Sequence, residues 1–258
     1  MLLAIDIGNT NVVFALCDEH RTVAEWRIRT DAHRTADEYA VWLFTLMEAD
    51  NHARQSVRGV IISSVVPEAN FELKTFTRKY LNQEPLVLAT GQIDCGMPVK
   101  IDNPKELGAD RIINAFAAWS AHNQALIVVD FGTATTFDVV SGNGEYLGGV
   151  IAPGINLSLD ALQRAAAKLH GIAITHPKQV IGTNTTAAMQ SGIFYGYAGL
   201  IEGIVSRIKE ERGESMKVIA TGGLAALYAD ATKAIDVVDQ DLTIRGLRLI
   251  YQRQKRNH

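Results

Sequence analysis

The stretch "AIDIGNTNVV", residues 4–13, decides the fold because it interrupts two apolar segments with a short polar turn. Apolar residues lead into Asp6, Gly8 permits a tight turn, and apolar residues resume afterwards. Asn9 and Thr10 place small polar side chains at the turn, beside exposed backbone N–H groups. Such a hairpin can surround phosphate oxygens with hydrogen-bond donors. One copy on its own nevertheless favours an ordinary polar turn without a ligand.

The same pattern returns at residues 126–140, "LIVVDFGTATTFDVV". When this segment is aligned with residues 2–16, Asp130 falls on Asp6, at an offset of 124 residues that is close to half of the 258-residue chain. Because this period is too long for a solenoid, it predicts two related domains. Paired hairpins can face each other across a cleft, so two copies favour ligand binding.

Strands and helices alternate in the rest of each half, which is typical of an α/β fold. The helix expected first begins with a capping-box spacing, Thr35 and Glu38. No flexible linker marks a boundary, which we place near residue 118, giving closely packed domains of residues 1–118 and 119–258. We expect strands at 21–30, 57–67, 85–90, 145–154 and 216–221, and helices at 35–50, 68–81, 155–169 and 185–212.

The composition indicates a cytoplasmic globular protein that binds neither nucleic acid nor membrane. Hydrophobic residues make up 47% of the chain, yet no segment approaches the roughly 18 apolar residues of a membrane span. A net charge of −3 gives no general attraction to nucleic acid or anionic lipid. The N-terminus lacks the basic region of a signal peptide. Cys17 and Cys95 form no disulfide or zinc pattern.

The two hairpins are the main candidates for phosphate binding, because the common motifs are missing. The sequence contains no Gly-Lys pair that could close a Walker A loop, no strand-opened GxGxxG, no HExxH and no GxSxG. Asp6 and Asp130 would repel phosphate directly. A cation must therefore lie between, either Mg²⁺ on a nucleotide or a monovalent ion.

The order of the motifs resembles a known family. A repeated Asp-x-Gly hairpin followed by the late "TGG" turn at 221–223 is similar to the actin-like ATPase superfamily, which includes sugar and acetate kinases. Within it, the chain resembles type III pantothenate kinases over most of its length, with "GADR" and "DFGTATT" as the most specific parts. The matching segments are "DIGNTNVVFA" (6–15), "NPKELGADRIINA" (103–115), "DFGTATTFD" (130–138), "GGVIAPG" (148–154) and "NTTAAMQSG" (184–192).

The resemblance implies a fold and a reaction. The fold would be two duplicated ribonuclease-H-like domains, of the actin-like ATPase type, with a nucleotide cleft between them. The reaction would be the ATP-dependent phosphorylation of pantothenate to 4′-phosphopantothenate, the first step of coenzyme A biosynthesis. It also implies a homodimer that uses Mg²⁺ with ATP and a potassium or ammonium ion.

The resemblance further implies a role for individual residues. Asp130 would bind the monovalent cation, Thr133 would be a second nucleotide contact, and Thr185 would contact the acceptor, supplied from a partner subunit. The acceptor segment would be Gly108, Ala109, Asp110 and Arg111, with Asp110 as the catalytic base. The first ATP phosphate loop would be Asp6, Ile7, Gly8, Asn9, Thr10, Asn11, Val12 and Val13. One departure is Ile101, since the family often has a tyrosine shortly before the Asn-Pro pair.

The residues of the acceptor segment also make sense on their own. Asp110 follows a turn at the start of an expected helix, where an ionised carboxylate is stabilised and can accept a hydroxyl proton. Arg111 can hold a polar or anionic acceptor group. The alternative is that Asp110 only caps the helix and Arg111 is solvated. For Thr185, a capping role is the slightly stronger interpretation.

One class of alternative to a kinase remains from the residues. A nucleotide-dependent binding, filament or regulatory module of the same fold needs no acceptor base, so the "GADR" segment separates it from an enzyme.

The helix expected at 185–212 is apolar over more than one face, which fits either a dimer interface or burial within the monomer.

Overall fold

The computed structural model describes residues 1–88, 94–165 and 172–256. The chain divides into two compact units. Unit 1 consists of Met1–Met97, Asp102–Ala117 and Asp241–His258, and unit 2 of Pro98–Ile101 and Ala118–Gln240. The expected domain of residues 119–258 differs from unit 2 in its C-terminal segment, because the last helix of the chain belongs to unit 1.

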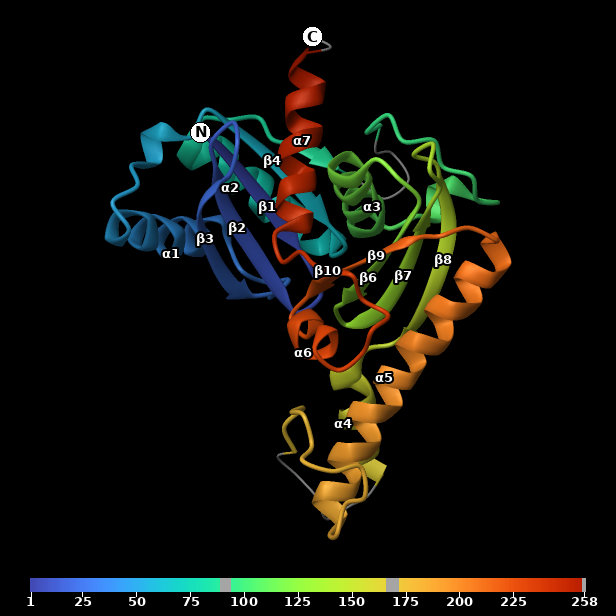
Figure 1. Cartoon of the computed structure of the whole chain (residues 1–258). Coiled ribbons are helices and arrows are strands. Elements are labelled where there is room, and N and C mark those ends of the chain that lie inside the picture. Colours follow the sequence, from blue (N-terminus) through green and yellow to red (C-terminus); the bar gives the residue numbers. More distant parts are fainter. Residues whose placement is uncertain (89–93, 166–171, 257–258) are drawn as a thin grey trace. The chain divides into compact units, whose positions relative to one another are not determined.

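The sheet of unit 1 has the order β3-β2-β1-β4-β5 (Figure 1). Three antiparallel strands, β1 (Leu2–Ile7), β2 (Asn11–Cys17) and β3 (Thr22–Arg29), form a meander. Two further strands, β4 (Gly59–Ser64) and β5 (Leu86–Leu88), continue the sheet in parallel with β1. This arrangement places the turn after β1 at the same end of the sheet as the end of β4.

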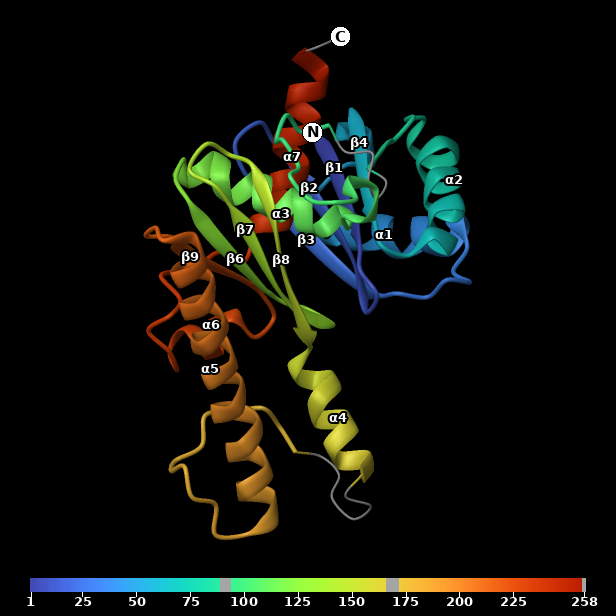
Figure 2. The ribbon, with the colours of Figure 1, turned by 90° about the vertical axis from the view of Figure 1, so that its right-hand side faces the viewer.

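The sheet of unit 2 has the equivalent order, β8-β7-β6-β9-β10 (Figure 1), and Figure 2 shows β6, β7 and β8 from another side. Its meander consists of β6 (Leu126–Phe131), β7 (Ala134–Val140) and β8 (Tyr146–Pro153), and its parallel strands are β9 (Lys217–Gly222) and β10 (Val237–Val238). The predicted duplication is therefore confirmed at the level of strand order and direction.

The duplication extends to the details of the strands. β1 and β6 share one pattern of buried and half-buried residues, and β2 and β7 share another. The register of each meander also shifts at the equivalent place, between Leu16 and Cys17 and between Val139 and Val140. The second turn is one residue shorter, because Ile7 pairs with Val12 whereas Phe131 pairs with Thr135.

Each helix expected from the sequence has a counterpart in the described structure, whereas α7 (Leu242–Arg256) was not expected. In unit 1, α1 (Ala36–Ala49) begins with the predicted capping box, in which Thr35 N donates to Glu38 Oε2 (2.8 Å). α2 (Asn70–Leu81) follows, and α3 (Ala109–His122) crosses the division between the units. Short 3₁₀ turns are formed by Arg54–Ser56, Pro67–Ala69 and Pro104–Glu106.

In unit 2, the helix expected at 185–212 is α5 (Thr185–Arg212), and α4 (Ile155–Ala165) and α6 (Ala225–Ala229) are shorter. Parts of two expected elements, 89–90 of a strand and 166–169 of a helix, lie outside the described residues. α7 (Leu242–Arg256) has basic residues in its last turn and packs against β1 and β4 of unit 1. Among the described helices, none has the length and apolarity of a membrane span.

Each sheet uses its two faces differently. In unit 1, Ile5, Ile7 and Phe14 contribute to a buried core with α1 and α2. Because side chains alternate along a strand, Asp6 points to the opposite face, which α7 covers. In unit 2, the core contains Phe131 together with residues of α5 and α6, and Asp130 points away from it. In both units the aspartate of the hairpin therefore lies on the face opposite the main core.

Candidate active site

The backbone of the first hairpin is held from several sides, although its tip is exposed. Gly8 N donates to Asn11 O at 3.0 Å and closes the turn. Thr30, just after β3, donates from Oγ1 to Gly8 O (2.6 Å) and from its backbone N to Thr10 O (2.9 Å). Asn9 and Thr10 remain exposed. The turn therefore offers polar groups on a fixed backbone, which suits the binding of phosphate. No motif in the sequence identified Thr30.

Asp6 lies in a row of side chains that crosses the sheet of unit 1. Its neighbours in register are Ser63 on β4 and Val13 on β2. Burial and the negative charge of Asp110 raise the pKa of Asp6 to about 7, against smaller opposing effects of Ser63 and Arg27. A cation beside Asp6 would therefore stabilise its ionised form. Ser63 was missed from the sequence, although two serines at the end of a buried strand were a usable signal.

Asp110 is the second residue of α3 and is half-buried. Its Oδ1 accepts a hydrogen bond from Arg111 N at 2.9 Å. A Cβ atom at Gly108 would lie 2.7 Å from the same oxygen, so a glycine is needed there to leave the carboxylate in place. Ala109 is buried and Arg111 is half-buried. The structure thus brings together Asp6 and Asp110, which the sequence placed in separate motifs.

The second hairpin is approached closely by two glycines of unit 2. A Cβ atom at Gly154 would lie 2.0 Å from Thr133 O. Gly222 has a φ of +92°, and a Cβ atom there would lie 2.8 Å from Asp130 Oδ1. Thr133 is exposed at the turn, which Gly132 N closes by donating to Ala134 O (3.1 Å). The "GGVIAPG" and "TGG" segments therefore pack on the hairpin that carries Asp130.

Two further predicted positions also belong to unit 2. Thr185 is the first residue of α5 and is exposed, but the cap of this helix is Asn184, whose side chain accepts from Ala187 N at 2.9 Å. The capping interpretation of Thr185 is therefore wrong. Ile101 packs near Gly148 of β8, with 3.7 Å between Ile101 Cγ2 and the Cβ position of that glycine.

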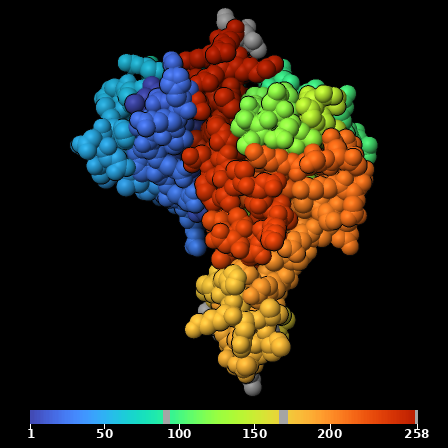
Figure 3. Space-filling view, in the orientation of Figure 1, coloured from blue at the N-terminus to red at the C-terminus, as the bar shows by residue number. Residues whose placement is uncertain are grey.

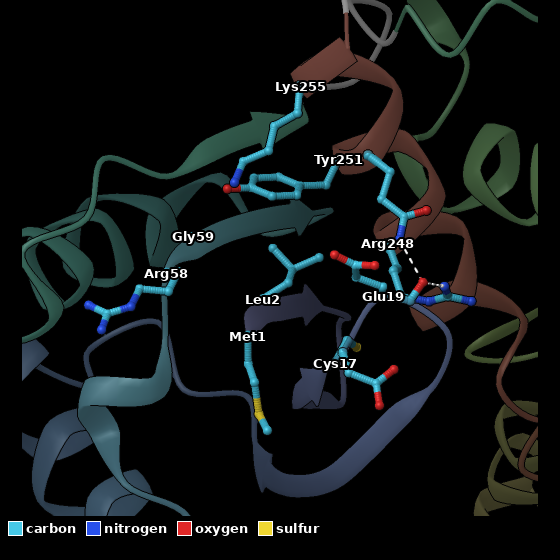
Figure 4. A pocket seen from close by; sticks show the side chains of 11 residues that line it. Met1, Leu2, Cys17, Glu19, Arg58, Gly59, Arg248, Tyr251 and Lys255 are labelled. Carbon is cyan, nitrogen blue, oxygen red and sulfur yellow. Dashed lines mark hydrogen bonds between the residues drawn. The ribbon is translucent and has the colours of Figure 1, made fainter.

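A cavity of about 320 Å³ lies elsewhere in unit 1, where β1 and β4 begin (Figure 4). Figure 4 shows Tyr251 above Leu2, with Cys17 below. Arg248 and Gln252 both donate to Glu19 O, and the lining carries charges of both signs. Because the strands run from this end toward the hairpin, the cavity is separate from the candidate active site.

Comparison with known proteins places this geometry in a class. The model of the family described as type III pantothenate kinase matches residues 2–207. Two curated type III pantothenate kinases are similar along nearly their whole length. The relative from Paramagnetospirillum magneticum is 56% identical (98% of this chain, 97% of the relative), and that from Phenylobacterium zucineum is 54% identical (99% of each). A solved ROK hexokinase from Thermus thermophilus has a TM-score of 0.53 at 12% identity and 99% coverage of each chain, which shows the fold alone.

The duplicated sheets, each with an Asp-x-Gly hairpin, form a two-domain α/β fold of the actin-like ATPase type. Among proteins of that fold, the match to the family model and the identity along nearly the whole chain determine the family. The chain belongs to the type III pantothenate kinase family and is an enzyme.

Proposed function

We propose that this chain transfers the γ-phosphoryl group of ATP to the primary hydroxyl of pantothenate, with Asp110 as the general base. The product is 4′-phosphopantothenate, in the first step of coenzyme A biosynthesis. Membership of the family supports the reaction. The observation that supports the residue assignment is the position of Asp110 at the start of α3, close enough to Asp6 for its charge to raise the pKa of that carboxyl.

The chemistry asks little more of the base than its position. A bond forms between the acceptor oxygen and the γ-phosphorus, and the bond from that phosphorus to the oxygen bridging it to the β-phosphate breaks. The hydroxyl proton passes to the Asp110 carboxylate. No histidine or lysine lies within Gly108–Arg111 to take it. Arg111, the next residue, is a candidate to bind the acceptor.

Both hairpins are proposed to bind ATP. The first contributes Asp6, Ile7, Gly8, Asn9, Thr10, Asn11, Val12 and Val13, and the second contributes Thr133. The described residues contain no cluster of three or more His, Cys, Asp or Glu side chains suited to a metal ion. The single carboxylate of the first hairpin, Asp6, fits Mg²⁺ that is held mainly by phosphate and water. When bound, Mg²⁺ neutralises negative charge on the phosphates.

A monovalent cation, potassium or ammonium, is proposed to bind at Asp130. The half-buried carboxylate lies between Thr221 and Thr136 in register, and the backbone of Gly222 lies against it. Oxygen ligands of this kind suit a hard cation. Such an ion would offset the repulsion between Asp130 and a polyphosphate.

The enzyme is further proposed to act as a cytoplasmic homodimer. In unit 2, Val180 and Ile181 are 63% and 80% exposed, and they lie in the segment that leads to α5 (gold in Figure 3). Cβ atoms at Gly192, Gly196 and Gly199 of α5 would contact nothing within 4 Å. These features leave apolar and small residues that a partner subunit can contact. Thr185 of one subunit would then contact the acceptor bound by the other subunit. Both cysteines are free and buried, as is usual in a reducing compartment.

The test is an ATP-consumption assay with pantothenate and related alcohols, with and without potassium. Pantothenate-dependent consumption that is increased by potassium is expected. Consumption that ignores every alcohol would reject the reaction and favour a nucleotide-dependent binding or regulatory module. Analytical ultracentrifugation tests the dimer, which a fully active monomer at micromolar concentration would contradict.

A further inference from the structure

The edge strand β3 carries arginines on the same face of the sheet as Asp6. Trp26 is buried in the core of unit 1, and its Nε1 donates to Asp50 Oδ2 at 2.7 Å. Because successive side chains of a strand point to opposite faces, Arg27 points away from this core. The first hairpin therefore has a cationic residue at the edge of its functional face.

The register places this arginine in the row of Asp6. Arg27 lies opposite Val13 on β2, and Val13 lies opposite Asp6 on β1. Neighbouring strands are about 4.8 Å apart, so the backbones at Arg27 and Asp6 are separated by about 10 Å. Val13, which lies between them, has a short side chain.

Arg27 is held only weakly by its present partner. Its Nη2 lies 3.1 Å from Glu25 Oε1, and the arginine side chain is 58% exposed. Exposed ion pairs of this kind contribute little stability, so the guanidinium can exchange Glu25 for a ligand. Its positive charge also reaches the hairpin, since it is one of the groups that lower the pKa of Asp6.

The equivalent row in unit 2 has no such cation. There Asp130 lies opposite Thr136, and Thr136 lies opposite Ile151, which is 64% exposed. Charged residues on edge strands can simply prevent aggregation. That requirement applies equally to β8, yet β8 presents an exposed isoleucine at this position. The arginine of β3 therefore points to a requirement specific to the first hairpin.

We propose that Arg27 binds the phosphate groups of ATP at the first hairpin, an inference that rests on the proposed kinase reaction. A guanidinium group presents several N–H donors in a plane that matches the oxygens of a phosphate. Placed two strands from Asp6, it supplies positive charge on the side of the polyphosphate away from that carboxylate. Arg27 is thus a residue that binds the nucleotide substrate and not the acceptor.

The experiment compares Arg27→Gln and Arg27→Lys with a matched control, Arg78→Gln. Arg78 is also an exposed arginine paired with an acid, Glu84, at 2.7 Å, but it lies on α2. Binding of ATP is measured by calorimetry without pantothenate, together with the KM values for both substrates. Arg27→Gln should weaken ATP binding about tenfold or more, Arg27→Lys should weaken it less, and Arg78→Gln should change it by less than about twofold. All melting temperatures should stay close to that of the unmodified chain.

Two results would overturn the assignment while leaving the kinase reaction intact. One is an Arg27→Gln variant whose ATP affinity equals that of Arg78→Gln. The other is a raised KM for pantothenate with unchanged ATP binding, which would move Arg27 to the acceptor side. If the unmodified chain itself bound no ATP, the proposed function would fail together with this inference.

Discussion

The two units share a backbone plan but differ in the side chains on one face of the sheet. Strand order, strand direction and the position of the register shift are the same in both. In the row of the hairpin aspartate, unit 1 carries Ser63, Asp6, Val13 and Arg27, whereas unit 2 carries Thr221, Asp130, Thr136 and Ile151. The duplication has therefore kept the core face, where packing constrains every residue, and has changed the opposite face.

The starts of two helices show the same divergence. The second residue of α3 is Asp110, and the second residue of α7, the helix in the equivalent topological position, is Thr243. Thr243 Oγ1 donates to Asn114 Oδ1 at 2.7 Å and so contributes to packing. Only the first copy of this position carries a carboxylate suited to proton transfer.

The largest effect is expected from Asp110→Asn, which removes the difference between the two helix starts. We expect kcat to fall by about 10² to 10⁴, because the base is lost while the shape is kept, and ATP binding to change little. The measurement is kcat per folded molecule, with a melting curve. Asp102→Asn, an exposed acid earlier in the same unit, serves as the control. Near-normal kcat in the folded Asp110→Asn variant would reduce "GADR" to a structural turn.

The second prediction concerns the pH dependence of the nucleotide-free protein. The pKa of Asp6 is about 7 in the folded chain and 3.8 in the reference state, so between these values the folded state binds more protons than the unfolded state. The free energy of unfolding should then fall as pH rises from about 4 to about 7, by at most about 4 kcal/mol from this group. Asp6→Asn should remove this slope and raise the stability at pH 7.5, as denaturant titrations can measure. Asp102→Asn is the control and should keep the slope, whereas an unchanged slope in Asp6→Asn would contradict the assignment.

The third prediction tests whether the second hairpin has its own cation. Asp130→Asn should raise the KM for ATP by about 10- to 100-fold and abolish the response to potassium, because the ligand charge is lost. Activity is measured over a potassium series at constant ionic strength. Asp160→Asn, an exposed acid on α4, is the matched control. An Asp130→Asn enzyme with the normal potassium response would remove this difference between the hairpins.

The smallest effect is expected at Gly222, the last residue of β9. The equivalent strand of unit 1, β4, ends at Ser64 instead. Gly222→Ala should destabilise the protein by about 1–3 kcal/mol, since φ is +92° and a Cβ atom would lie 2.7 Å from Phe131 O. Gly223→Ala is the control, because a Cβ atom there meets nothing within 4 Å. Equal melting temperatures for the two variants would show that the close approach of Gly222 is not required.

Much of the fold was determined by the sequence itself. The two Asp-x-Gly hairpins were visible because a glycine and small polar residues interrupt apolar strands in a way that depends only on neighbouring residues. The same holds for the capping box at Thr35 and for α5, whose expected bounds agree with the structure. The family resemblance read from these segments was confirmed by the comparisons.

Only the tertiary structure decided which residues meet. Asp6 and Asp110 are far apart in the chain, and neither motif contains information about their mutual distance. Ser63 and Arg27 join the row of Asp6 through strand register, which arises from pairing between distant segments. The assignment of α7 to unit 1 likewise depends on packing against β1 and β4. Local sequence fixes turns and caps because their energies are local, whereas a site assembled across a sheet exists only once the strands have paired.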